Sequence, residues 1–334
     1  MTRRVLLFLA ACIFLAGGCR VHEVPTDGGP DGGSVVELTL KLNLDKALSL
    51  YQEIPFETKA EEYEARYVVA LFRYASETPN TKPDYVFLFT EPEMQDRSYM
   101  VEVAPMNYKV VAWVDYVKGG EAFYTSPLLA GAMESESSFQ EVTLVPGSYT
   151  GNSPWRDAFY GAQDVKLASY LTNRSQHEME VTLARPNAHF NFVATDRDQF
   201  VENIASKGSN HFDVSDFSVK VTYPQFLPCT YNLFTDKPVD SRTGVSFDVE
   251  PTLLEDGNVE VGSDWVFANA DKTTVIVSLS FYDAKGQYIS SLNNIEVPLC
   301  QGKNTTIKGA LLTNGVSSGI SIDPSFDGEI IINF

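Results

Sequence analysis

Apolar and polar residues alternate along much of the chain from Ser34 onward. In the segment SVVELTLKLNL, the side chains of Val36, Leu38, Leu40 and Leu42 fall on one side and polar side chains on the other. A two-residue period of this kind is typical of a strand with one buried face. Six further strand-like runs follow in the first half: RYVVALFRY, DYVFLFT, YMVEVA, YKVVAWVDYV, QEVTLV and MEVTLA.

The second half of the chain has the same character. Its strand-like runs are FNFVATD, FSVKVTY, VSFDVE, TTVIVSLSFYD, QYISSLNNIEV and NTTIKGALL, and its best helical segment is short, at 198–206. Two blocks of about seven strands each, separated by turn residues, favour two β-sandwiches in tandem. Pro186 cannot continue a central strand ladder, so we place the boundary there. The sequence predicts an all-β protein with sandwiches at 34–184 and 185–334.

The N-terminus has the features of an export signal. Arg3 and Arg4 precede an apolar run from Val5 to Ala16, which is too short for a membrane-spanning helix and has the length of a secretory core. Small residues and then Cys19 follow, and this arrangement resembles a bacterial lipobox, although Ala16 stands where leucine is usual. We interpret 1–18 as a signal peptide and Cys19 as the lipidated first residue. An ordinary signal peptide that leaves Cys19 as a free thiol is the alternative.

Residues 19–33 are rich in glycine, proline and aspartate, which is the composition of a flexible tether. Asp27 and Asp31 lie there without the series of ligands that a calcium loop needs. The formal net charge is −19, and removing residues 1–18 takes away two arginines and no acid, which makes it −21. Such a surface repels nucleic acid.

No motif in the sequence carries catalytic or metal chemistry. The four histidines do not form zinc-binding spacings with cysteines, and no phosphate-binding glycine loop occurs. The segment 315–319 matches G-x-S-x-G, but no histidine follows it, as a hydrolase triad of that type requires. We therefore expect no enzyme activity, no cofactor and no metal site. Cys229 and Cys300 could form a disulfide in an oxidising compartment, or be two separate buried thiols.

Several segments together resemble one known family. They are EVAPMNYKVVAWVDY (102–116), SPWRDAFYG (153–161), VTLARPNAHFNFVATD (181–196), EVPLCQGKNTTIKGALLT (296–313) and ISIDPSFDGE (320–329). Their order and spacing, across nearly the whole mature chain, are similar to the fimbrillin-like lipoproteins of the type V pilus system. The resemblance implies two transthyretin-like β-sandwich domains and export to the outer membrane. It also implies assembly by donor-strand exchange, in which a protease removes the first strand and a neighbour's C-terminal strand fills the groove.

Two parts of the sequence permit this mechanism. Lys59 and Arg66 follow the first strand and are candidate maturation sites, unless they are ordinary solvated charges. The chain ends in GEIIINF, where Ile330, Ile332 and Phe334 share one face. That apolar strand could close its own domain or enter a partner's groove, because an exposed edge invites pairing.

These observations leave more than one function open. The leading hypothesis is a pilus subunit or pilus-associated lipoprotein with a role in adhesion, held at the outer membrane and cell surface through a lipid on Cys19. Its partners would be other pilus subunits and ligands on host or bacterial surfaces. The alternative is a surface lipoprotein that does not polymerise and binds a glycan or a host protein. Stalk, tip and anchor roles all remain open.

Overall fold

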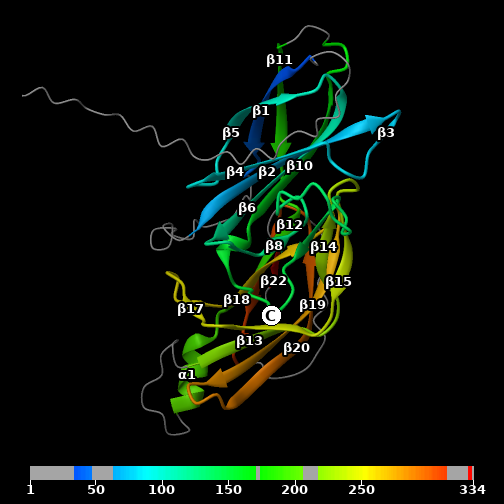
Figure 1. Cartoon of the computed structure of the whole chain (residues 1–334). Coiled ribbons are helices and arrows are strands. Elements are labelled where there is room, and N and C mark those ends of the chain that lie inside the picture. Colours follow the sequence, from blue (N-terminus) through cyan, green and yellow to red (C-terminus); the bar gives the residue numbers. More distant parts are fainter. Residues whose placement is uncertain (1–33, 47–62, 171–173, 206–216, 314–329, 333–334) are drawn as a thin grey trace, which may run out of the picture.

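The computed structural model describes residues 34–46, 63–170, 174–205, 217–313 and 330–332. Nearly all regular structure in these residues is β (Figure 1), which confirms the all-β prediction. The described α-helix is α1 (Arg197–Ala205), close to the predicted helical segment, and a 3₁₀ turn spans Pro154–Arg156. No helix in the described part of the chain is both long enough and apolar enough to cross a bilayer.

The first half forms a sandwich of two sheets. In one sheet, β1 (Val36–Leu44) lies between β5 (Arg97–Val103) and β11 (Ser175–Leu183). The facing sheet has the order β10–β6–β2–β3, with β4 on β2 and β7 on β6. Its strands are β2 (Glu64–Ala75), β3 (Thr78–Pro79), β4 (Tyr85–Glu91), β6 (Asn107–Lys118), β7 (Glu121–Ala122) and β10 (Ala158–Lys166).

Strand β2 is apolar on both faces, and the structure explains why. Tyr67, Val69 and Leu71 point into the sandwich core with β1, whereas Val68 and Ala70 belong to a second core on the other side of the sheet. An unbroken apolar run is what a strand buried on both faces requires. The sheet that contains β2 and β6 is therefore an inner layer of the molecule.

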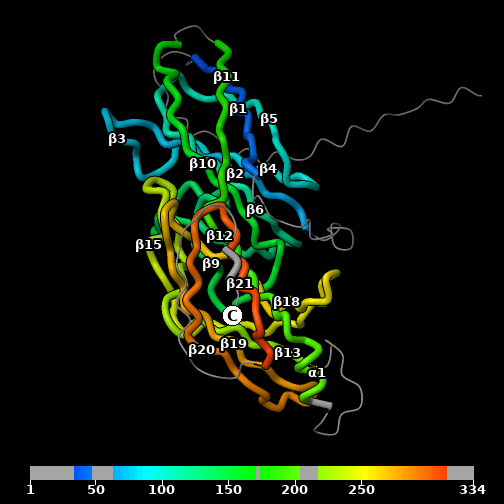
Figure 2. Tube along the Cα trace, turned by 180° about the vertical axis from the view of Figure 1, so that it is seen from behind, coloured from blue at the N-terminus to red at the C-terminus, as the bar shows by residue number. Residues whose placement is uncertain are grey.

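The second half forms another sandwich. One sheet has the order β17–β18–β12–β21–β22, with β12 and β21 parallel and side by side in Figure 2, and the other has the order β16–β13–β19–β20. The strands are β12 (Asn187–Ala194), β13 (Phe217–Tyr223), β16 (Val245–Val249), β17 (Thr252–Leu253), β18 (Val259–Phe267), β19 (Thr273–Asp283), β20 (Tyr288–Leu299), β21 (Asn304–Gly309) and β22 (Ile330–Ile332).

A further sheet joins the two halves. Its order is β15–β14–β9–β8, from β8 (Tyr124–Thr125), β9 (Glu141–Leu144), β14 (Leu227–Asn232) and β15 (Lys237–Arg242). Because β9 precedes residue 184 and β14 follows it, their antiparallel pairing crosses the predicted boundary. The core beneath this sheet likewise mixes both halves, with Trp113 beside Tyr231 and Phe267. The boundary at 184/185 remains a prediction, and the two sandwiches are tied by shared backbone pairing.

Candidate strand-exchange site and the junction between the sandwiches

Strand β1 fills a slot between two other strands. It pairs in parallel with β11 along its whole length and antiparallel with β5 from Val36 to Leu42. Val36, Leu38, Leu40 and Leu42 have no exposed surface, as their alternation predicts. Full burial of such a side chain contributes about 1.5–3 kcal/mol. Without β1, the strands β5 and β11 would be separated by a gap one strand wide over an open apolar core.

The outward face of β1 makes only surface contacts. Lys41 Nζ lies 2.6 Å from a carboxylate oxygen of Glu178, and both side chains are well exposed. Gln176 donates to Glu37 at 3.0 Å, also at the surface. Exposed pairs of this kind contribute about 0–1 kcal/mol. The slot therefore holds β1 through backbone pairing and an apolar row, which another strand with the same alternation could supply.

Arg66 is held in the middle of paired structure. It lies on β2 between β4 and β6. Its guanidinium donates to both oxygens of Asp115, at 2.9 and 2.6 Å, and Asp115 has no exposed surface. Burial raises the pKa of Asp115, and Arg66 opposes that rise. The sequence offered two interpretations of Arg66, a maturation site or a solvated charge, and neither describes this buried ion pair. A protease would reach the peptide bond after Arg66 only if β2 left its sheet.

Cys19 and Lys59 lie outside the described residues.

The two cysteines of the second half are separate buried thiols, which is one of the two alternatives that the sequence left open. Cys229 lies on β14 in the core shared by both halves. Cys300 follows β20, and its Sγ donates to the carbonyl of Ala270 at 2.8 Å. Burial raises the pKa of both thiols. Strands β14 and β20 belong to different sheets, and spacing in the sequence gave no sign of this.

The C-terminal strand pairs within its own chain. Ile330 and Ile332 lie in β22, which runs parallel to β21 at the edge of its sheet. Phe334 and the segment 315–319 lie outside the described residues. Here β22 closes its own sheet, which was one of the two expectations. In the described part of the chain, no three His, Cys, Asp or Glu side chains gather closely enough to hold a metal ion.

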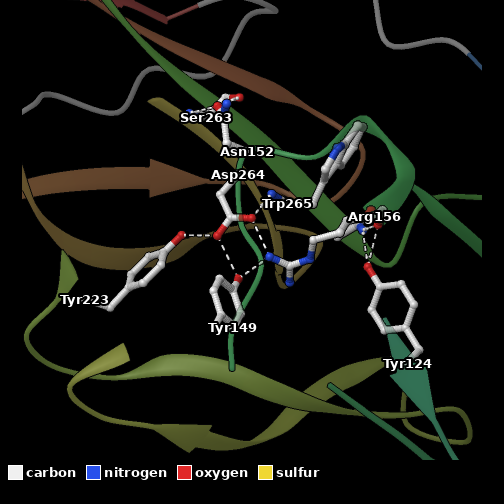
Figure 3. Close-up of polar contacts among 9 residues, drawn as sticks. Tyr124, Tyr149, Asn152, Arg156, Tyr223, Ser263, Asp264 and Trp265 are labelled. Carbon is white, nitrogen blue, oxygen red and sulfur yellow. Dashed lines mark hydrogen bonds and ion pairs between the residues drawn. The ribbon is translucent and has the colours of Figure 1, made fainter. Parts of the chain in front are cut away.

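A buried polar cluster connects the sandwiches (Figure 3). Asp264, on β18, accepts hydrogen bonds from Arg156 and from the hydroxyls of Tyr149 and Tyr223, the latter two at 2.7 and 2.6 Å. The backbone N–H of Trp265 donates to the same carboxylate at 2.8 Å. Arg156 comes from the first half and is 2% exposed. Each carboxylate oxygen of Asp264 thus accepts two hydrogen bonds, as a buried carboxylate requires.

The neighbouring contacts extend this cluster. Tyr124 donates to the backbone carbonyl of Arg156 at 2.5 Å, and Asn187 donates to the same carbonyl at 3.3 Å. Beside them, Arg185 contacts both carboxylate oxygens of Asp157 at 2.8 and 2.9 Å. Burial raises the pKa of Asp264, and the attraction of Arg156 opposes that rise. The junction is therefore a set of matched charges that fixes one half against the other.

The family model for DUF6562, a family of unknown function, matches residues 30–334. The chain belongs to this family. No curated protein matches it in sequence. It is similar to the solved fimbrial anchor protein Mfa2 from Porphyromonas gingivalis, with 13% identity, 76% of this chain and 81% of that chain covered, and a TM-score of 0.42.

This DUF6562 chain is also similar to a solved fimbrial assembly protein from Parabacteroides distasonis. The identity is 13%, with 81% of this chain and 90% of that chain covered and a TM-score of 0.39.

Sequence reasoning missed the junction of this DUF6562 protein. Arg156 and Asp157 stand in SPWRDAFYG, which carried part of the resemblance, but their partners are Asp264 and Arg185. The one available signal was local: an arginine and an aspartate lie between aromatic residues in an otherwise apolar segment. Which distant acid would neutralise Arg156 could not be found from that signal.

Proposed function

We propose that this DUF6562 protein is a cell-surface pilus subunit or pilus-associated lipoprotein that joins its neighbours by strand exchange and acts in adhesion. The observation that carries the proposal is the position of β1, inserted between β5 and β11 with a complete apolar row in the core. A strand so placed can be replaced by one from a neighbour, which restores the same pairing and the same burial.

The proposal includes the ends of the chain. Residues 1–18 act as a signal peptide, Cys19 carries the lipid that holds the precursor at the outer membrane, and 19–33 form the tether. Maturation cuts between β1 and β2, and Lys59 suits this role better than Arg66, because Arg66 is locked in an ion pair with Asp115. A neighbour's C-terminal strand, with Ile330, Ile332 and Phe334 as its apolar face, then enters the slot. We also propose that the protein is not an enzyme.

The slot can be tested directly with a peptide. A chain that begins at Arg20 is given a site-specific protease site between Lys46 and Tyr63 and is cut. A fluorescent peptide of residues 34–46 is then added, and its anisotropy is followed in mild denaturant. We expect the peptide to exchange into the slot and to remain bound after dilution, because backbone pairing and the apolar row are both restored.

The matched control is the same peptide with Leu38→Asp and Leu40→Asp, which keeps the backbone donors and removes the apolar fit. We expect it not to enter. Failure of both peptides, with β1 retained permanently by the cut protein, would show that β1 is a fixed element and would refute strand exchange.

A further inference from the structure

A cleft opens beside the junction, in the first half of the chain. Its volume is about 710 Å³, and it lies among the start of β2, the β6–β7 turn, β8 and the segment that leads from β9 to Arg156. This volume is in the range of pockets that hold small organic ligands, about 300–1,000 Å³. The strand-exchange slot lies elsewhere, between β5 and β11, so the mechanism proposed above makes no use of this cleft.

Aromatic side chains form much of the cleft wall. Tyr63, Phe123, Tyr124 and Tyr149 all line it. The ring of Tyr63 is nearly parallel to that of Phe123, with 12° between the planes, and is stacked on Trp155 at 4.6 Å between centroids. Stacked rings give a rigid, flat apolar surface at little cost in side-chain entropy. The C–H face of a sugar ring fits a surface of this kind.

The charges of the cleft are balanced. Arg66 and Arg156 line it, but each faces a buried aspartate, namely Asp115 or Asp264. The remaining charged residues of the lining are one cation and one anion, Lys118 and Glu121. The net local charge is therefore about zero, and the chain as a whole carries −19. A neutral ligand suits this site better than an anion, which the overall field would repel.

The two arginines of the cleft are held in fixed positions. Asp115 fixes the guanidinium of Arg66 through two hydrogen bonds, and Asp264 with Tyr149 fixes that of Arg156. Hydroxyl side chains of Ser148, Thr150 and Ser153 line the same space. Donors and acceptors that are already oriented lose little freedom on binding. Such groups are matched by the hydroxyl groups along the edge of a sugar.

From these observations we infer that the cleft binds a neutral saccharide. Its aromatic wall contacts the apolar face of a sugar ring, while the hydroxyl side chains and Arg66 meet the hydroxyl groups. This binding function is additional to strand exchange and does not depend on it. It would give the protein a surface ligand whether or not the chain polymerises.

The first experiment uses the full chain from Arg20 onward on an array of oligosaccharides. One set is neutral, built from galactose, mannose, fucose and N-acetylglucosamine, and the other is sialylated or sulfated. We expect binding confined to the neutral set, with titration calorimetry giving the affinity of the strongest ligand. Binding to no oligosaccharide, or to the acidic set alone, would overturn the inference.

Variants then locate the site. Phe123→Ala removes part of the wall, and we expect the affinity to fall by about tenfold or more. Thr150→Val keeps the shape of an exposed side chain and removes one hydroxyl, so it should weaken binding without affecting folding. Tyr288→Ala, at an exposed position on β20, is the control, and equal losses in it and in the cleft variants would place the binding elsewhere.

Discussion

In the described part of the chain, three arginine–aspartate pairs lie largely below the surface: Arg66–Asp115, Arg156–Asp264 and Arg185–Asp157. A buried pair contributes little net stability compared with apolar packing, but the loss of one partner leaves an uncompensated charge away from water. Of the three pairs, Arg156–Asp264 is the most buried, at 2% and 0% side-chain exposure. We therefore expect the junction to be intolerant of single substitutions.

Asp264→Asn removes the charge that Arg156 faces and leaves the shape nearly unchanged. We expect a loss of about 3–5 kcal/mol in the free energy of unfolding, as for other broken buried pairs. The control is Asp248→Asn, whose exposed carboxylate lies 3.9 Å from Lys220 Nζ and should contribute less than about 1 kcal/mol. Unfolding in guanidinium measures the free energy of unfolding of both variants. An equally small loss in Asp264→Asn and Asp248→Asn would show that the Arg156–Asp264 pair does not stabilise the fold.

His189 makes stability depend on pH. Burial lowers its pKa from 6.5 to about 4, although the contact with Asn304 opposes that shift. The folded state therefore binds this proton less readily than the unfolded state. Its stabilising contribution is fully present above pH 6.5 and is lost as the pH falls toward 4, by about 3 kcal/mol in total.

The test compares the free energy of unfolding of the wild type and of His189→Gln at each pH. Acidic residues titrate in the same range, but they are present in both proteins, so their effects cancel in the difference. We expect the wild type to lose stability relative to the variant between pH 6.5 and 4. His177→Gln, which changes a histidine on β11, is the control. Parallel pH profiles for the wild type and His189→Gln would contradict the assignment.

The two thiols give a simple chemical prediction. The chain from Arg20 onward, unfolded in guanidinium without reductant, should show two reactive thiols with Ellman's reagent, because Cys229 and Cys300 are separate. The folded protein should react slowly, since both are buried. A count of zero in the unfolded chain would reveal a disulfide and contradict this structure.

At the scale of the element, strands with regular alternation were predictable. The segments of β1, β13 and β19 bury every second residue, as their sequences indicate. Strands with breaking residues were missed, namely β10, β14, β15 and β18. Gly161 lies within β10, Pro228 within β14 and Pro238 within β15, and these residue types are uncommon inside strands. In β18, the charged residue Asp264 interrupts the apolar pattern of the sequence. Pro238 fits because β15 is an edge strand, and Pro228 stands at a register shift of β14. Gly161 and Asp264 fit because of distant neighbours, which local pattern cannot reveal.

Gly161 shows this most clearly. A Cβ atom there would lie 2.4 Å from the backbone oxygen of Thr182 and 2.7 Å from Leu183. We expect Gly161→Ala to destabilise the protein by about 1–3 kcal/mol, because β10 and β11 would have to separate. Ala162→Val, on the exposed side of β10, should change stability by less than about 0.5 kcal/mol. Thermal unfolding compares the two, and a neutral Gly161→Ala would disprove the close approach.

At the scale of the whole molecule, the two sandwiches are joined in two ways. Residues of both halves form one core against the second face of the sheet that contains β2 and β6, and β9 pairs with β14. The two-block organisation was visible in the sequence because each block repeats a series of alternating strands. The sheet that crosses between them was not, because its strands lie far apart in the chain. The slot that holds β1 is in the first sandwich (Figure 1), and the end of β1 reaches the junction, where Arg185 donates to the backbone carbonyl of Asp45 at 3.5 Å.

The most direct test of strand exchange is assembly after a defined cut. The chain from Arg20 onward, cut at a protease site placed between Lys46 and Tyr63, is concentrated and run on a gel without boiling. We predict a ladder of regularly spaced bands that collapses on boiling and is suppressed by excess peptide of residues 34–46, but not by the peptide with Leu38→Asp and Leu40→Asp. A cut protein that stays monomeric at every concentration would contradict assembly by strand exchange.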